Sequence, residues 1–156
     1  MIVLGTGNEL GGDDGAGNHT AQVLNRRLEA ESGAGGKRKI LAIDAGTAPE
    51  NYTSIIRREC PELLVLVDAA EMDLPPGYVR LVGPERLKTL SFSTHRMPLT
   101  SLIDYVKALC GRVVLIGIQP SEKEHGQGLS TPVRQAAEQV AELLLNGQVD
   151  EIKALE

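Results

Sequence analysis

Three carboxylates and one imidazole occupy positions from which they could act on a common substrate. Asp44 and Asp68 each directly follow a short β-branched run, Asp14 follows the first such run, and His95 precedes a helical pattern. Carboxylate oxygens and an imidazole nitrogen can hold a divalent metal while leaving positions open for substrate or water. The residue types therefore predict a metal-assisted site.

The segments between these residues alternate between short β-branched runs and longer helical patterns, which is typical of a parallel sheet covered by helices. Strands are predicted at 2–5, 40–43, 63–67 and 113–118, with an edge strand of uncertain direction at 78–82. Helices are predicted from Asp13 or Asp14 onward and at 49–59, 98–109 and 132–145. We predict an α/β fold, a single three-layer α/β/α sandwich domain over residues 1–156 with about five mostly parallel strands.

Ligands of open α/β sheets bind outside the carboxyl ends of the parallel strands. Gln119 ends the last predicted strand, so we expect it to line one cleft with the four residues named above. Each residue also has a simpler interpretation when taken alone, since Asp13 or Asp14 could cap the first helix and an isolated histidine is often structural. Their convergence on one edge favours a shared site.

A glycine-rich loop after the first strand, residues 5–12, offers a different function. It could bind a dinucleotide, with Asp44 on the ribose. Its spacing is G-x-G-x-x-x-G, however, and Glu9, Asp13 and Asp14 place negative charge where a pyrophosphate would bind. The glycines more simply allow a tight turn and the close approach of another backbone, such as a substrate strand.

Composition narrows the possible partners and the compartment. The net charge is −5 and only 3% of residues are aromatic, so we expect no nucleic-acid partner. No apolar run approaches the roughly 20 residues of a membrane span, so we expect no membrane insertion. The two cysteines, Cys60 and Cys110, form no C-x-x-C pair. We predict a cytoplasmic protein.

Several strings follow one another along most of the chain. They are Gly7-Asn8 with Gly12-Asp13-Asp14-Gly15-Ala16-Gly17, residues 44–51 (DAGTAPEN), Val67-Asp68-Ala69, residues 94–99 (THRMPL) and Gly117-Ile118-Gln119-Pro120. Together they resemble the hydrogenase maturation endopeptidases. Two of them, residues 44–51 and 94–99, are most similar to the branch that serves formate-hydrogenlyase-type and related membrane-bound [NiFe] hydrogenases.

The resemblance implies an endopeptidase that removes the C-terminal extension from the nickel-loaded large-subunit precursor of a [NiFe] hydrogenase. It implies that nickel arrives with the substrate, that no nucleotide is needed, and that Asp14, Asp68 and His95 contact the metal. Asp44 matches an aspartate linked to activity, so the implied catalytic set is Asp14, Asp44, Asp68 and His95. The first acidic position is often Glu in the family, and Asp14 is shorter.

We expect the enzyme to be a monomer. A NAD(P)- or nucleotide-binding Rossmann-like protein is an alternative that would use the glycine loop and Asp44. A non-enzymatic nickel chaperone is another, which would use the same metal-contacting residues but leave the precursor uncut.

Overall fold

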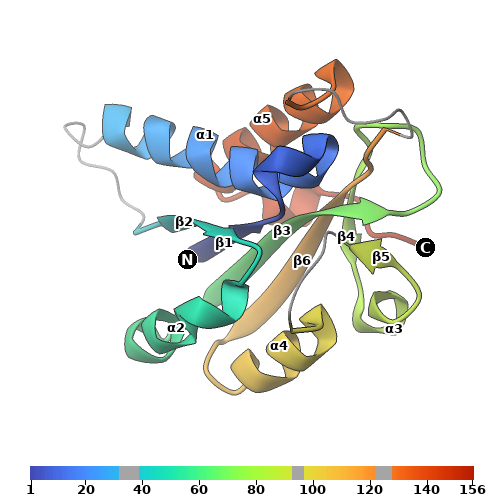
Figure 1. Cartoon of the computed structure of the whole chain (residues 1–156). Coiled ribbons are helices and arrows are strands. Elements are labelled where there is room, and N and C mark those ends of the chain that lie inside the picture. Colours follow the sequence, from blue (N-terminus) through green and yellow to red (C-terminus); the bar gives the residue numbers. More distant parts are fainter. Residues whose placement is uncertain (32–38, 93–96, 122–127) are drawn as a thin grey trace.

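The computed structural model describes residues 1–31, 39–92, 97–121 and 128–156. Within these residues, six strands form a mixed sheet in the order β2-β1-β3-β6-β4, with β5 paired to the end of β3 (Figure 1). The strands are β1 (Ile2–Thr6), β2 (Leu41–Gly46), β3 (Leu63–Glu71), β4 (Val79–Val82), β5 (Ser91–Phe92) and β6 (Arg112–Ile118). The predicted fold class is confirmed.

The structure gives the direction of the edge strand β4, which the sequence did not predict. β1, β2, β3 and β6 run parallel, whereas β4 runs antiparallel to β6. The short antiparallel strand β5 was not predicted. Both β2 and β3 extend beyond their predicted ends, so Asp44 and Asp68 lie inside strands and do not follow them.

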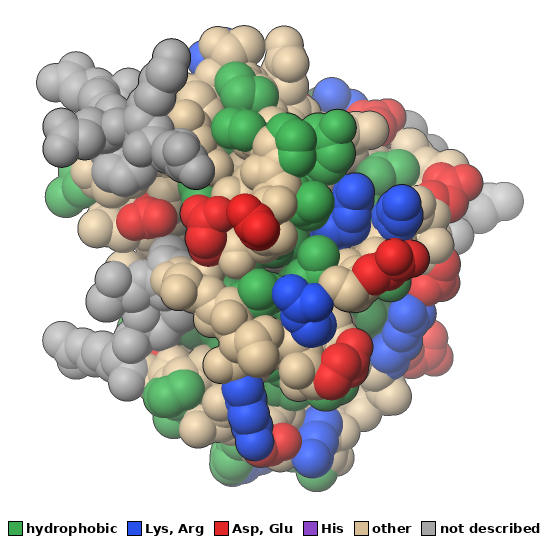
Figure 2. All heavy atoms as spheres, turned by 90° about the vertical axis from the view of Figure 1, so that its right-hand side faces the viewer, with side chains coloured by type: hydrophobic (Ala, Val, Ile, Leu, Met, Phe, Trp, Pro, Cys, Tyr) green, Lys and Arg blue, Asp and Glu red, His purple; other side chains and the backbone are tan. Residues whose placement is uncertain are grey.

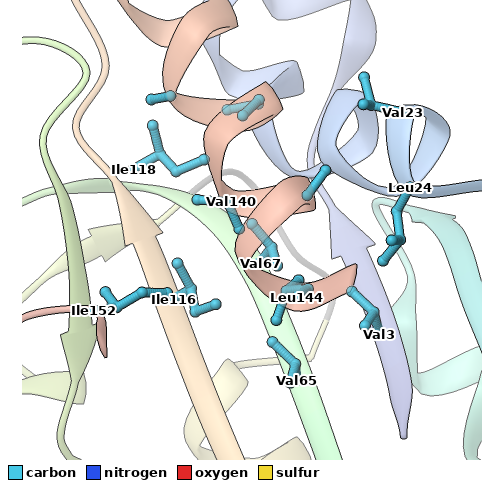
Figure 3. Close-up of a cluster of buried hydrophobic side chains, with 14 of the residues drawn as sticks. Val3, Val23, Leu24, Val65, Val67, Ile116, Ile118, Val140, Leu144 and Ile152 are labelled. Carbon is cyan, nitrogen blue, oxygen red and sulfur yellow. The ribbon is translucent and has the colours of Figure 1, made fainter. Parts of the chain in front are cut away.

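Helices cover both faces of the sheet (Figure 1). One layer consists of α1 (Ala16–Glu31) and α5 (Thr131–Leu145), and the other of α2 (Thr53–Glu59), α3 (Pro84–Leu87) and α4 (Leu99–Val106). Strand β3 is buried on both sides, which explains its unbroken apolar sequence from Leu63 to Val67. Figure 3 shows the cluster under α5, where Val140 and Leu144 pack over Val65, Val67 and Ile116.

Local sequence determines where the helices begin and end. Helix α2 follows the 3-10 helix η2 (Pro49–Tyr52) and ends at Cys60, which has a left-handed φ of 43° and precedes Pro61. Pro132 lies in the first turn of α5, where its missing N–H costs no hydrogen bond. A short 3-10 helix, η3 (Val149–Glu151), follows α5. The predicted long helices are therefore present, with small shifts at their ends.

The first helix begins differently from the prediction. A 3-10 helix, η1 (Glu9–Gly15), precedes α1, and Asn8 caps it by accepting a hydrogen bond from the N–H of Leu10 at 3.0 Å. Asp13 and Asp14 both lie inside η1, so neither caps α1 as predicted. Their side chains are therefore available for interactions other than capping α1.

Charged side chains of both signs are mixed on the face of the molecule that Figure 2 shows. Lys and Arg side chains alternate there with Asp and Glu, without a large basic patch. Among the described residues, none of the helices combines the length and the apolar character that crossing a bilayer requires.

Candidate active site at the carboxyl edge of the sheet

Helix α1 sits unusually close to the sheet because glycines face backbone there. A Cβ added at Gly17 would collide with the carbonyl oxygens of Val67 and Thr6, and one added at Gly5 would collide with the carbonyl oxygen of Gly17. These glycines therefore allow strand and helix backbones of the same chain to touch. Packing within the chain therefore explains Gly5, the first glycine of the loop 5–12, without a dinucleotide or a substrate strand.

The loop η1 is fixed in place and presents Asp14. The N–H of Asn8 donates to the carbonyl oxygen of Asp14 at 3.1 Å, which closes the loop on itself. Gly12 has φ 64° and ψ −120°, a conformation open essentially to glycine alone, so the chain bends sharply before the two aspartates. Asp13 is buried at 3% exposure, whereas Asp14 is half-buried.

The Asp14 carboxylate lies against Gly11 and makes no hydrogen bond to another described residue. A Cβ at Gly11 would stand 3.1 Å from Asp14 Oδ2, so a larger residue there would press on the carboxylate. The η1 segment also packs against β3, the strand that carries Asp68. Asp14 is thus held by its backbone while its oxygens stay available to a ligand.

Asp44 lies in an open hollow of about 430 Å³ between the end of β2 and η1. Its Oδ1 accepts from Asn18 Nδ2 at 2.6 Å and from the N–H of Gly46 at 3.2 Å, and its Oδ2 accepts from Gln22 Nε2 at 2.9 Å. The hollow is lined by Gly7, Asn8, Glu9, Asn18, Asp44, Ala45, Gly46, Thr47 and Tyr52. Asp44 is therefore firmly oriented yet reachable.

A second carboxylate, Glu9, faces Asp44 across this hollow. Gln22 Nε2 donates to Glu9 Oε1 as well as to Asp44, so one amide joins the two acidic residues. The hydrogen bond with Asp44 is the main cause that raises the pKa of Glu9. Burial alone would raise the pKa of Asp44, but the hydrogen bonds it accepts from Asn18, Gln22 and Glu9 outweigh burial and lower it. Glu9 is the member of the pair that takes up a proton first.

Asp68 is fully buried inside β3, on the side of the sheet opposite Asp44. Gly5 pairs with Asp44 on one side and with Val67 on the other, so Asp44 and Val67 share the face covered by α1. Asp68 alternates with Val67 and therefore faces the other layer, as Leu66 does. The structure does not bring Asp44 and Asp68 onto one face.

The predicted metal set includes His95, which lies outside the described residues. Among the residues that are described, no three His, Cys, Asp or Glu side chains gather as a metal site would require. The joint contact of Asp14, Asp68 and His95 with a metal therefore stays a prediction.

Gln119 does not line the cleft as predicted. It is 2% exposed, and its Oε1 accepts from the N–H groups of Met72 at 2.7 Å and Leu74 at 3.3 Å. Its Nε2 donates to Glu71 Oε1 at 2.7 Å. Gln119 joins the ends of β3 and β6, because a buried amide needs partners and the adjacent strand end supplies them.

Sequence reasoning missed the residues that surround Asp14 and Asp44. Glu9 was considered only as a charge opposing a pyrophosphate, and Asn18 and Gln22 were not considered. A usable signal existed: Asn18 and Gln22 are four positions apart on α1 and therefore share one helix face. That this face meets Asp44 depends on strand order, which the sequence does not state directly.

Comparison with known proteins decides the family. A family model described as hydrogenase maturation protease (HycI) matches residues 19–147 of the chain. The chain belongs to the hydrogenase maturation protease family. It is 36% identical over 144 residues to the hydrogenase 3 maturation protease of Escherichia coli K12, covering 92% of this chain and 87% of that protein.

Solved structures agree with this family and with the fold. The solution structure of the endopeptidase HycI from E. coli has a TM-score of 0.77 and 32% identity, covering 99% of this chain and 96% of that one. A HycI [NiFe] hydrogenase maturation protease from Thermococcus kodakarensis has a TM-score of 0.75 and 31% identity, covering 94% and 90%. This hydrogenase maturation protease is thus a peptidase hydrolase, and the dinucleotide-binding alternative loses its support.

Proposed function

We propose that this hydrogenase maturation protease removes the C-terminal extension from the nickel-loaded large-subunit precursor of a [NiFe] hydrogenase. It would act as a monomer in the cytoplasm, with Asp14, Asp68 and His95 contacting nickel that the substrate carries. The observation that carries the proposal is the state of the Asp14 carboxylate. Its carboxylate makes no hydrogen bond to another described residue, although the loop that presents it is closed by hydrogen bonds.

Recognition through the substrate's own metal would not require a deep specificity pocket. The hollow beside Asp44 is open, and the described edge of the sheet is built largely from backbone and short side chains. Nickel held by the precursor would take oxygen and nitrogen ligands from the enzyme. This anchoring would fix the scissile bond beside the carboxylates, which is how positioning lowers a reaction barrier.

Asp44 would act indirectly. Through Gln22 it is linked to Glu9, which belongs to the same short helix as Asp14. Its negative charge would keep η1 in a fixed position relative to β2, and this would keep the Asp14 side chain in place. This role fits its place on the face of the sheet opposite Asp68.

The direct test is a time course of precursor processing, with nickel-loaded precursor in excess. Asp68→Asn and His95→Ala should each collapse cleavage while circular dichroism shows a folded protein. Asp104→Asn is the matched control, because Asp104 is an exposed aspartate on α4 that forms a surface ion pair with Lys107. Wild-type cleavage rates for both site variants would refute the proposed nickel contact.

Two substrate controls separate the remaining explanations. Nickel-free precursor and casein should stay intact, because neither provides the metal anchor. Efficient cleavage of either would place recognition elsewhere. A nickel chaperone would bind the loaded precursor and leave it uncut, which mass spectrometry of the precursor distinguishes from loss of the extension.

A further inference from the structure

Asp13 is a buried carboxylate that the proposed reaction does not use. Its Oδ1 accepts from the N–H of Ser130 at 2.7 Å. Its Oδ2 accepts from the N–H of Ser121 at 2.9 Å and from Ser130 Oγ at 2.8 Å. Ser121 lies shortly after β6 and Ser130 directly precedes α5, so one side chain joins both ends of the connection between these elements.

The donors to Asp13 among the described residues are two backbone N–H groups and one hydroxyl, all of them neutral. Burying a carboxylate is costly, and a well-packed apolar residue is often at least as stable in such a place. The position beside Asp13 is Asp14, whose Cα is only one peptide unit away. Gly12 bends the chain so that Asp13 turns inward and Asp14 does not.

We propose that Asp13 is a positioning residue that fixes Asp14 by tying η1 to the two ends of the β6–α5 connection. Glu9 and Gln22 hold η1 from the side of β2, and Asp13 holds it from the side of β6. The inference rests on the proposed function only in that Asp14 contacts the substrate's nickel.

Asp13→Asn tests the inference with little change in shape. An amide offers one acceptor oxygen, so its NH₂ must face the N–H of either Ser121 or Ser130. With nickel-loaded precursor, kcat per folded molecule should fall about 10- to 100-fold, as it does when residues that orient a ligand are altered. A purely structural role would lower the melting temperature but leave kcat per folded molecule at the wild-type value, and that result would overturn the inference.

Ser130 provides a milder variant in case Asp13→Asn does not fold. Ser130→Ala removes only the hydroxyl donor and should lower kcat several-fold, while Ser130→Thr keeps the hydroxyl and should restore it. Ser54→Ala, at an exposed position on α2, is the matched control and should be silent. Equal kcat values for the Ala and Thr variants at residue 130 would contradict the inference.

Asp14→Ala distinguishes failure of this inference from failure of the proposed function. If Asp14→Ala abolishes cleavage while Asp13→Asn cleaves at the wild-type rate, only the positioning role is wrong. If Asp14→Ala itself cleaves at the wild-type rate, both the nickel contact and positioning through Asp14 are refuted.

Discussion

Replacing Asp44 by Asn tests the hydrogen-bond network of the hollow. In the wild type, Oδ1 accepts from Asn18 and Gly46 while Oδ2 accepts from Gln22. Asn keeps one acceptor oxygen, so its NH₂ must oppose an amide NH₂ of either Asn18 or Gln22. Losing one hydrogen bond to a charged group costs about 1.5–3 kcal/mol. Because the hollow is open to water, we expect about 1–2 kcal/mol, or a fall in Tm of about 2–8 °C.

The pH dependence of this cost has a definite sign. The folded-state pKa of Asp44 is lowered, so its ionised form stabilises the protein above the pKa of the unfolded chain, and that stability is lost as the pH falls through the folded-state pKa. The full difference in the free energy of unfolding between the wild type and Asp44→Asn should therefore be measured by urea unfolding at pH 7. The difference should shrink below about pH 4.

Processing assays on the same variant separate two roles of Asp44. Support for η1 predicts a loss of about 10- to 100-fold in cleavage rate. A loss well above that range, toward 10⁴-fold, would instead mean that Asp44 activates water as a general base. Asp104→Asn serves as the control for stability. If Asp44→Asn and the wild type unfolded at the same urea concentration at pH 7, the hydrogen-bond network around Asp44 would be refuted.

Three other substitutions test separate parts of the structure. Glu9→Gln removes the carboxylate whose pKa Asp44 raises, so urea unfolding at pH 7 should show unchanged or higher stability, and a clear loss would contradict the pairing. Gly17→Ala places a methyl group against two backbone carbonyls and should cost about 1–3 kcal/mol by urea unfolding, together with cleavage activity. Gln119→Leu strands the N–H of Met72 and should cost about 1–3 kcal/mol without changing kcat per folded molecule.

The fold was predictable because its signals are local. The run 63–67 is apolar at every position, which is typical of a strand buried on both faces. Pro132 and Cys60-Pro61 mark where helices begin and end. The direction of β4 was not predictable, since four residues of mixed character pair equally well in either sense. The pairing of β5 with β3 rests on two residues and carries no pattern.

The site was predictable only in part, for the same physical reason. Asp44 and Asp68 could be assigned to the carboxyl edge from strand positions alone. Which face each side chain takes depends on one residue of register, because alternation reverses the face at every step. Gln119 was also expected at that edge, but its amide oxygen accepts from the backbone N–H groups of Met72 and Leu74, in the segment that directly follows β3. A polar residue at a strand end can serve the fold as readily as a ligand.

The proposed support of Asp14 by its neighbours would have a chemical consequence. An aspartate oriented by donors on its own oxygens has fewer lone pairs left for a ligand and binds it less strongly. Here the donors act one residue away on Asp13 and across the hollow on Asp44, and in the proposed arrangement the backbone of η1 would transmit the constraint. The η1 segment would then be ordered before substrate binds, while both oxygens of Asp14 remain without a hydrogen bond among the described residues. Ordering the segment in advance would lower the entropic cost of binding, and leaving the carboxylate unoccupied would preserve its full strength as a ligand.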